Sequence, residues 1–204
     1  MSNYDLDYFF LRQPKGNEKL PFLIPDASTE DRKFRSNRQP LGSPPLFFHN
    51  AWRAEVKKRG VHTIVPPVLF SGADIIIATE IRNKLLALEL SGLSLHPAVY
   101  VDDQDIWHED YWFVTFTEEL DCWDRATSYF EEEVEPVTVG GETLYQVYEY
   151  RLDAKILDAV PLERRLLFKM GGTLKGMVVC HKSLIKIFTP SANAGLDIVG
   201  ILDY

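Results

Sequence analysis

Apolar residues recur along the second half of the chain with spacings that predict short strands and few helices. Residues 75–77 form an apolar run typical of a strand, and residues 97–101 predict another. The aromatic segment at residues 110–119 alternates between two faces that are both substantially apolar, which predicts a third strand.

Two glycine pairs predict hairpins. Gly140-Gly141 joins two β-rich runs, and a two-residue hairpin turn needs positive φ at both of its central residues. Gly171-Gly172 predicts a second hairpin, ahead of an apolar Met-Val-Val run. We therefore expect an α+β fold, with a largely antiparallel β-sheet, few packed helices and a Pro-rich N-terminal arm.

One helix is predicted over residues 79–91, between two of these strands. Thr79 stands where an N-cap residue is expected, and Gly92 follows as the residue that ends the helix. Apolar residues at helical spacing are expected to pack on the sheet: Ile81, Leu85 and Leu88.

The same order of elements returns near the C-terminus. A strand at residues 177–179, a short helix at 182–188 and a strand at 197–202 are predicted there. In both places a Gly-Leu pair precedes the last strand, at residues 92–93 and 195–196. This recurrence predicts a strand–helix–strand repeat. The alternative is chance, because glycine and proline commonly end helices and strands in unrelated segments.

The N-terminal part of the chain has a different composition. Residues 12–50 are rich in proline and glycine, which predicts an extended arm or a set of loops after a first strand near residues 4–11. We accordingly divide the chain into residues 1–65, a strand and Pro-rich arm packed on the main domain, and residues 66–204, an α+β domain.

Charge is distributed unevenly along the chain. The net charge of the 204 residues is -8, which argues against a general binder of nucleic acid or anionic membranes. Between Asp102 and Glu135, thirteen acidic residues face a single arginine, Arg125, which gives a net charge of -12. Residues 1–60 hold eleven basic and seven acidic residues, a net charge of about +4. The acidic segment is either a solvated face or a surface that meets a positive partner.

Other features of the sequence favour a soluble, cytoplasmic protein with reduced thiols. No apolar run approaches the roughly 20 residues that span a bilayer. The N-terminus lacks the basic and apolar regions of a signal peptide. Cys122 and Cys180 are far apart and form no metal-binding pair.

Several segments resemble catalytic or metal-binding motifs only in part. Residues 171–176, GGTLKG, lack the Gly-Lys-Ser/Thr ending of a phosphate loop. Residues 102–110, DDQDIWHED, offer oxygen ligands and one imidazole, but not the central glycine and terminal glutamate of a calcium loop. We expect this segment to be an exposed acidic loop.

The candidate nucleophiles are also weak. Cys122 has acidic neighbours that disfavour a thiolate, so we expect a buried structural cysteine. Ser128 and Ser183 belong to no known nucleophile motif. Aromatic residues near the acids are assigned to the core or to sheet faces: Tyr100, Trp107, Tyr111, Trp112, Trp123 and Tyr129. The sequence therefore predicts no enzyme, no cofactor and no metal site.

The order of segments is similar to that of a known family. A strand, a helix ending in Gly-Leu and the strand YWFVTF are followed by DCWDRATSYF, by YRLDAKILDAVPLERRLLFKM and by a closing AGLDIVGI. This order resembles immunity family eleven of bacterial polymorphic toxin and type VI secretion systems. The similarity covers residues 66–204 and rests on a few residues: Asp121, Cys122, Asp124, Ser128 and Phe130.

The resemblance implies a protein that protects its maker by binding a cognate toxin and has no activity of its own. Acids could occupy the basic surface of a toxin that attacks nucleic acid. The residues expected to bind the partner are Asp102, Asp103, Asp105, Glu109, Asp110, Glu131, Glu132, Glu133 and Glu135. Two alternatives stay open: a metal-dependent hydrolase that uses the cluster at residues 102–110, and a non-enzymatic scaffold or adaptor.

Overall fold

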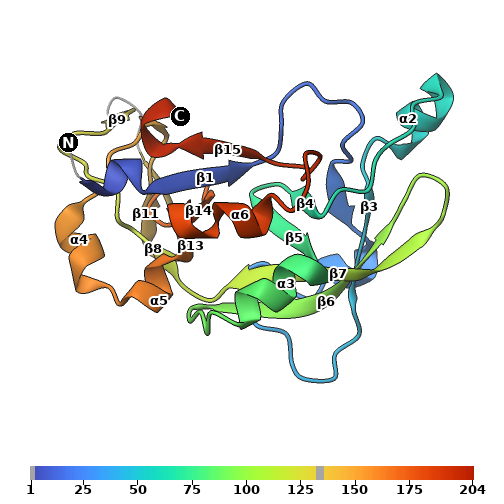
Figure 1. The fold of residues 1–204 in the computed structure, drawn as a ribbon, viewed down its shortest axis with the longest axis horizontal. Coiled ribbons are helices and arrows are strands. Elements are labelled where there is room, and N and C mark those ends of the chain that lie inside the picture. Colours follow the sequence, from blue (N-terminus) through green and yellow to red (C-terminus); the bar gives the residue numbers. More distant parts are fainter. Residues whose placement is uncertain (1–2, 132–135) are drawn as a thin grey trace.

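The computed structural model describes residues 3–131 and 136–204, which form the predicted α+β fold on two main sheets (Figure 1). The larger sheet has six strands in the order β2-β3-β6-β7-β5-β4. Phe22, next to β2, pairs with Phe70 in β4, so that the sheet is a nearly closed barrel. Its strands are β2 (Leu23–Pro25), β3 (Leu46–Asn50), β4 (Val68–Ser71), β5 (Asp74–Ala78), β6 (Leu93–Val101) and β7 (Trp107–Phe116).

The second sheet has five strands in the order β15-β1-β14-β13-β8. The N-terminal strand β1 pairs antiparallel with β14 on one side and with β15 on the other. The short β8 adds to β13 in parallel. The strands are β1 (Tyr8–Arg12), β8 (Glu119–Leu120), β13 (Leu167–Met170), β14 (Val178–His181) and β15 (Asp197–Gly200).

Two short ribbons complete the β structure. One pairs β9 (Tyr129–Phe130) with β12 (Val147–Glu149), and the other pairs β10 (Val137–Val139) with β11 (Glu142–Leu144). The predicted hairpin at Gly140-Gly141 is confirmed, with φ of 62° and 89° at its two glycines. The hairpin between β13 and β14 is confirmed too, but its connection runs over residues 171–177.

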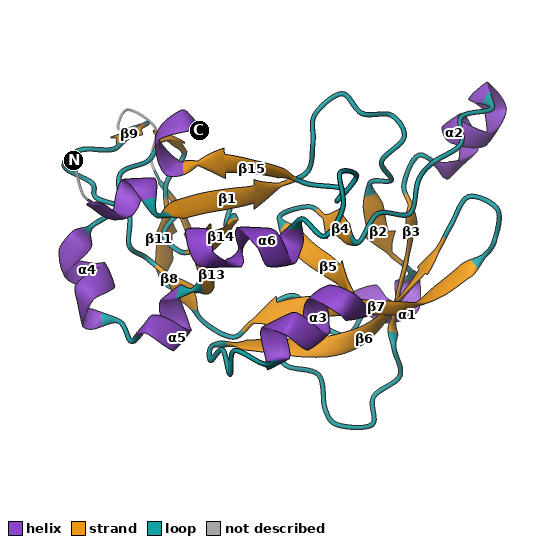
Figure 2. Cartoon of the chain, viewed as in Figure 1, coloured by secondary structure: helices purple, strands orange, loops and turns teal. Residues whose placement is uncertain are grey.

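The helices are short (Figure 2). The α-helices are α1 (Ala27–Glu30), α2 (Arg53–Arg59), α3 (Thr79–Leu86), α4 (Ala154–Ala159), α5 (Leu162–Arg165) and α6 (Ile185–Phe188). The 3-10 turns are η1 (Asn3–Leu6), η2 (Lys182–Leu184) and η3 (Ile201–Asp203). Among the described residues, no helix has the length and apolar character needed to cross a membrane.

Helix α3 ends earlier than the sequence predicts. Ile81 and Leu85 are buried, as predicted, but Leu88 is 38% exposed because it lies in a turn beyond the last helical residue. The prediction that Thr79 caps the helix is wrong. Its hydroxyl donates to the carbonyl of Asp110 and accepts from the indole of Trp112, so that it joins α3 to β7 instead.

Three apolar clusters hold these layers together. The first lies between the two sheets and combines side chains of β4, β5 and β7 with those of β1, β13 and β14 and of helices α3 and α6. The second fills the barrel, where the ring of Phe34 contacts those of Phe48 and Phe113. The third buries Trp123 and Tyr150 between the second sheet and the ribbons.

The two sheets share one topology over four strands each. In the barrel, β4-β5-β7-β6 are adjacent and successively antiparallel, and α3 connects β5 to β6. In the second sheet, β13-β14-β1-β15 are also adjacent and antiparallel, and η2 and α6 connect β14 to β15. The predicted strand–helix–strand recurrence therefore extends to the strand order, with β1 in the place that β7 holds in the barrel.

The N-terminal residues form the predicted first strand and a set of loops, but further strands interrupt the loops. Residues 1–65 supply an interior strand of the second sheet, β1, and two strands of the barrel, β2 and β3. The loops predicted over residues 12–50 are thus wrong at Leu23–Pro25 and at Leu46–Asn50. The first strand also begins later than predicted, at Tyr8, after the 3-10 turn η1.

Candidate partner-binding surface

Asp102 lies at the tip of the β6–β7 hairpin and is only 4% exposed. One carboxylate oxygen accepts the backbone N–H groups of Gln104 and Ile106 at 2.8 and 2.9 Å, and the other lies 2.9 Å from Nε2 of His108. Burial acts to raise the pKa of Asp102, but the hydrogen bonds from His108 and the two amides outweigh it and lower the pKa. Asp102 therefore closes the hairpin turn, and its predicted place in an exposed acidic loop is wrong.

Asp103 is buried as well, with 1% of its surface exposed. Its carboxylate accepts hydrogen bonds from the amide of Asn50 at 3.2 Å and from the hydroxyl of Thr63 at 2.6 Å. It thereby ties the hairpin tip to the end of β3 and to the segment before β4. A partner cannot reach this carboxylate without opening the fold, so its predicted role in partner binding is not compatible with its position.

The remaining acids of this group are exposed. Asp105 forms ion pairs with Arg53 and, at 3.6 Å, with Lys57 on α2, and the hydrogen bond from Arg53 lowers its pKa. Glu109 and Asp110 lie on β7, and neither forms an ion pair with any described lysine or arginine. The basic residues of α2 thus compensate the charge of Asp105, but not that of Glu109 and Asp110.

The residues that carry the family resemblance have structural roles. Asp121 pairs with Arg125 through two hydrogen bonds of 2.6 and 2.5 Å. The guanidinium of Arg125 also lies 4.1 Å from the ring centre of Trp123. Gly172 has φ of +67°, and a Cβ there would come within 2.8 Å of this ion pair, so that a larger residue would be strained and would displace the pair.

The rest of this motif fixes the start of β9. The carboxylate of Asp124 accepts the backbone N–H of Ala126 at 2.8 Å, as in an Asx turn. Ser128 accepts the N–H of Arg151 at 2.9 Å through its hydroxyl, which also donates to the carbonyl of that residue. The ring of Phe130 packs on Trp123 at 5.2 Å between centroids. The motif therefore attaches the ribbon β9–β12 to the second sheet.

Beyond this motif the ribbon presents an acidic and aromatic face, which we call the ribbon surface. It consists of the exposed residues Tyr129, Tyr148 and Glu149 and the half-buried Glu131. Tyr129 is 63% exposed and Tyr148 is 42% exposed, and their ring centroids are 5.7 Å apart. The hydroxyl of Tyr148 donates to Glu131 at 2.8 Å, which raises the pKa of the tyrosine. Glu149 is the register partner of Tyr129.

No basic residue compensates this face. Residues 126–150 contain no lysine or arginine, and within the described part of the chain neither Glu131 nor Glu149 forms an ion pair. The predicted partner-binding residues Glu132, Glu133 and Glu135 lie outside the described residues. Unlike the acids at the hairpin tip, those of the ribbon surface thus have no lysine or arginine paired with any of them among the described residues.

The two acidic groups lie far apart. Figure 1 places β9 at one end of the long axis of the molecule, and the β6–β7 hairpin tip and α2 at the other. One small contact on a partner therefore cannot span both groups. The single acidic segment of the sequence, residues 102–135, is therefore divided in the fold between the hairpin tip and the ribbon surface.

Aromatic exposure was the feature that sequence reasoning missed. Tyr129 and Trp107 lie on β9 and β7, which agrees with the predicted choice of core or sheet face, but they are 63% and 57% exposed. Tyr100, Tyr111 and Trp123 are buried. The long interval without a basic residue between Arg125 and Arg151 was the available signal for the ribbon surface.

The candidate catalytic groups are held by other contacts. Cys122 is fully buried, as predicted, with its sulfur 3.9 Å from that of Met170, and burial raises the pKa of its thiol. Among the described residues, no three histidine, cysteine, aspartate or glutamate side chains are placed to hold a metal ion. Of the residues proposed for a hydrolase, Asp102 and His108 bind each other and Asp103 binds Asn50.

Comparison with known proteins finds neither a matching family model nor a matching curated protein.

Proposed function

We propose that this protein neutralises a bacterial protein toxin by forming a stoichiometric complex with it in the cytoplasm of the producing cell. The resemblance to immunity family eleven supports this proposal. The observation that carries it is the ribbon surface, where two exposed tyrosines lie beside carboxylates without ion-pair partners. Tyrosine is enriched at protein interfaces, and uncompensated acids attract a basic partner.

The same chemistry suits a toxin that attacks nucleic acid. Such a toxin needs lysine and arginine side chains to bind phosphates. A rigid acidic face can cover those side chains, and it increases the rate at which the two proteins meet. The ribbon is attached to the second sheet by Ser128 and Phe130, so that little order has to be gained on binding.

Co-expression tests the proposal. The product of the gene adjacent to this one should arrest growth when expressed alone, and this protein should restore growth and co-elute with it in equimolar amounts. A neighbour that is harmless, or that never co-elutes, contradicts the proposal.

Tyrosine variants locate the contact. Tyr129→Ala combined with Tyr148→Ala should weaken the complex at least tenfold, because exposed aromatic anchors contribute most of the energy of many interfaces. Trp107→Ala is the matched control, since Trp107 is a similarly exposed aromatic at the opposite end of the molecule. If the control weakens the complex and the tyrosine variant does not, the contact lies at the hairpin tip.

A further inference from the structure

Strand β15 lies at an edge of the second sheet, and its pairing determines which of its backbone groups are free. On β14, the N–H of His181 donates to the carbonyl of Leu166, next to β13, so that the neighbouring residue Cys180 faces β1. Cys180 is the register partner of Phe9, which therefore faces β14. Backbone groups alternate sides along a strand, so the next residue of β1, Phe10, faces β15.

The same alternation leaves the outer side of β15 unpaired. Phe10 is the register partner of Val199, which therefore faces β1. Its neighbours Ile198 and Gly200 direct their N–H groups away from the sheet, where no strand pairs with them among the described residues. The carbonyl of Ile198 points the same way, whereas that of Gly200 accepts the first bond of the 3-10 turn η3. An unpaired strand edge of this kind is a template for another strand.

The barrel shows what occupies this position in the matching unit. In the shared topology β15 corresponds to β6, and the outer edge of β6 is covered by β3, which pairs with it in parallel. β3 has the apolar and aromatic sequence LFFHN and comes from the N-terminal part of the chain. The second sheet therefore has the same edge but lacks the strand that covers it in the barrel.

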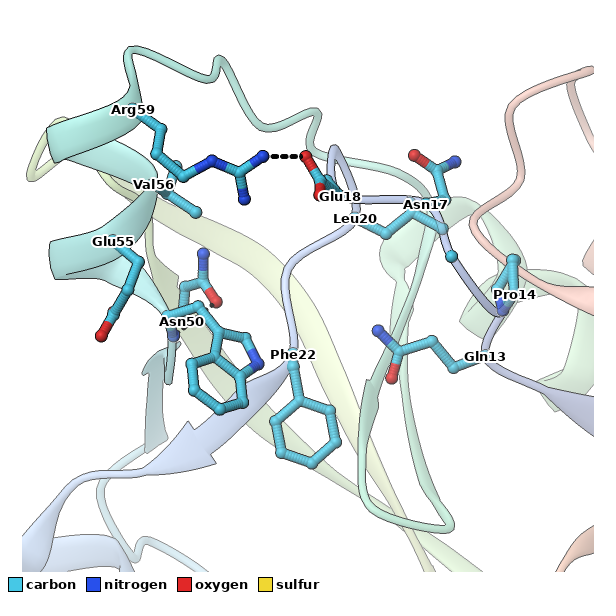
Figure 3. Close-up of a pocket in the computed structure, with 12 residues that line it drawn as sticks. Gln13, Pro14, Asn17, Glu18, Leu20, Phe22, Asn50, Glu55, Val56 and Arg59 are labelled. Carbon is cyan, nitrogen blue, oxygen red and sulfur yellow. Dashed lines mark hydrogen bonds and ion pairs between the residues drawn. The ribbon is translucent and has the colours of Figure 1, made fainter.

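The loop that follows β1 adds no strand to this edge. Residues 13–22 turn from the end of β1 toward α2, and Figure 3 shows Glu18 of this loop paired with Arg59 of α2. The ion pair measures 2.6 Å, and the side chain of Gln13 donates to the carbonyl of Pro21 at 3.2 Å. These two contacts hold the loop to α2 and to itself, so that β15 stays uncovered.

The side chains of β15 favour an uncharged, apolar neighbour. Ile198 and Val199 point to opposite faces of the sheet, and both are half-buried, so that part of their apolar surface remains open at the edge. The one charged residue of the strand, Asp197, lies 3.7 Å from the guanidinium of Arg12 on the neighbouring strand. A strand added here would pack β-branched or aromatic side chains against both apolar residues.

We propose that the edge of β15 accepts an extended, uncharged segment of the protein partner as an additional strand. The identity of this partner as a toxin rests on the proposed function. In Figure 1, β15 runs toward the end of the molecule that carries β9, so that a protein bound at the ribbon surface can also reach this edge. In such a contact the main-chain hydrogen bonds provide affinity, and the alternate side chains provide specificity. The competing occupant is a second copy of this chain.

Amide hydrogen exchange of the free protein, followed by NMR, tests whether the edge is open. The N–H of Val199 should exchange at least about a hundredfold more slowly than those of Ile198 and Gly200, because only Val199 is bonded to β1. Slow exchange of Ile198 at every protein concentration would mean that the edge is not free. Slow exchange that appears only at high concentration would mean that a second copy occupies it. Either result overturns the proposal.

A proline at the edge tests the contact with the partner. Gly200 has φ of -55°, which proline accepts, so that Gly200→Pro removes a free donor without breaking a bond to β1. Gly200→Ala is the matched control, because it adds the same Cβ beside Asp203 and keeps the N–H. The proline variant should weaken the complex with the product of the adjacent gene about tenfold relative to the alanine variant.

Exchange in the wild-type complex gives a second readout that does not depend on a variant. The N–H of Ile198 should become protected when the partner binds, because it then donates to the added strand. Thermal unfolding of Gly200→Pro and Gly200→Ala identifies any loss of folding. If the proline variant does not fold, the protection of Ile198 in the wild-type complex decides the proposal.

The outcomes separate this inference from the proposed function. If the complex forms and protects cells, but Ile198 gains no protection from exchange or a folded Gly200→Pro binds as well as Gly200→Ala, the strand contact is overturned and the proposed function stands. If the neighbouring protein is harmless yet binds and protects Ile198, the proposed function fails and the strand contact stands. A neighbouring protein that does not bind contradicts both.

Discussion

Asp102 is a buried carboxylate whose charged form is stabilised by hydrogen bonds. The variant Asp102→Asn should lower the free energy of unfolding by about 1–3 kcal/mol at neutral pH, because three hydrogen bonds to a charged acceptor are weakened together. Urea unfolding at several pH values measures this difference. Glu109→Gln, an exposed acid on the same hairpin, is the control and should change stability by less than about 0.5 kcal/mol.

The effect of Asp102 should depend on pH. The folded protein holds the pKa of this carboxyl below its usual value of 3.8. Its contribution is therefore complete above that value and is lost as the pH falls through the lower pKa of the folded state. The stabilities of the wild type and Asp102→Asn should therefore begin to converge below about pH 4 and should meet only below the pKa of the folded state. A difference that stays constant down to pH 2 would mean that the carboxylate contributes through its shape alone.

The two cysteines offer a second test at this scale. Burial raises the pKa of the Cys180 thiol to about 12 and raises that of Cys122 as well. The thiolate is the reactive form, so neither cysteine should react with a thiol reagent at pH 8 while the protein is folded. Both should react once urea unfolds the chain. Rapid labelling of one thiol in the native protein would show that the core around that cysteine unfolds locally and exposes it to solvent.

Single residues explain why the sequence predicted some sites and not others. The prediction that Cys122 is a buried structural cysteine is confirmed; it rested on acidic neighbours, which disfavour a reactive thiolate. It failed for Asp102 and Asp103, since their partners include Asn50 and Thr63, which are distant in sequence. A run of acidic residues in the sequence shows how many carboxylates are present, but not which of them are buried and hydrogen-bonded in the fold.

Helix α3 provides a matched pair of substitutions at the scale of elements. Leu85→Ala should lower the free energy of unfolding by about 2–5 kcal/mol, because Leu85 is 2% exposed between the two sheets. Leu88→Ala should cost less than about 1 kcal/mol, since Leu88 is 38% exposed beyond the end of the helix. Urea titration compares the two variants. Equal losses would mean that the helix extends to residue 91, as its periodicity suggests.

Elements with a strong local signal were predictable. Gly140-Gly141 permits a turn with positive φ at both residues, and the apolar run at residues 75–77 became β5. Strands β2 and β3 were missed because they are short and flanked by proline, and because their pairing is not local. β3 pairs in parallel with β6, where Leu46 is the register partner of Ala98, and no local pattern shows a pairing at such a distance along the chain.

The shared topology of the two sheets gives the whole molecule an internal order. Helices α3 and α6 lie in the same core between the sheets. The outer edge of β6 is covered by β3, whereas the corresponding edge of β15 has no partner strand among the described residues. The Gly-Leu pairs and the apolar runs predicted that the strand–helix–strand order recurs. They did not predict that β1, the first strand of the chain, lies between β14 and β15 in the second sheet.

Charge is separated along the same molecule. The ribbon surface is acidic without compensation, and the opposite end combines the basic helix α2 with the hairpin acids. The sequence predicted the imbalance of charge correctly, but the fold places the two acidic segments at opposite ends. We therefore expect Glu131 and Glu149, rather than Asp102 and Asp103, to steer the partner.

The rate of association with the partner tests this account most directly. The rate constant is measured by stopped flow against salt, with the toxic neighbour as partner, for the wild type and two charge variants. Glu131→Gln with Glu149→Gln should slow association several-fold at low salt and flatten its salt dependence, because fewer charges steer the encounter. The control, Glu109→Gln with Asp110→Asn, should behave as the wild type. If the ribbon variant associates at the wild-type rate at every salt concentration, the ribbon surface is only a solvated face and the account is contradicted.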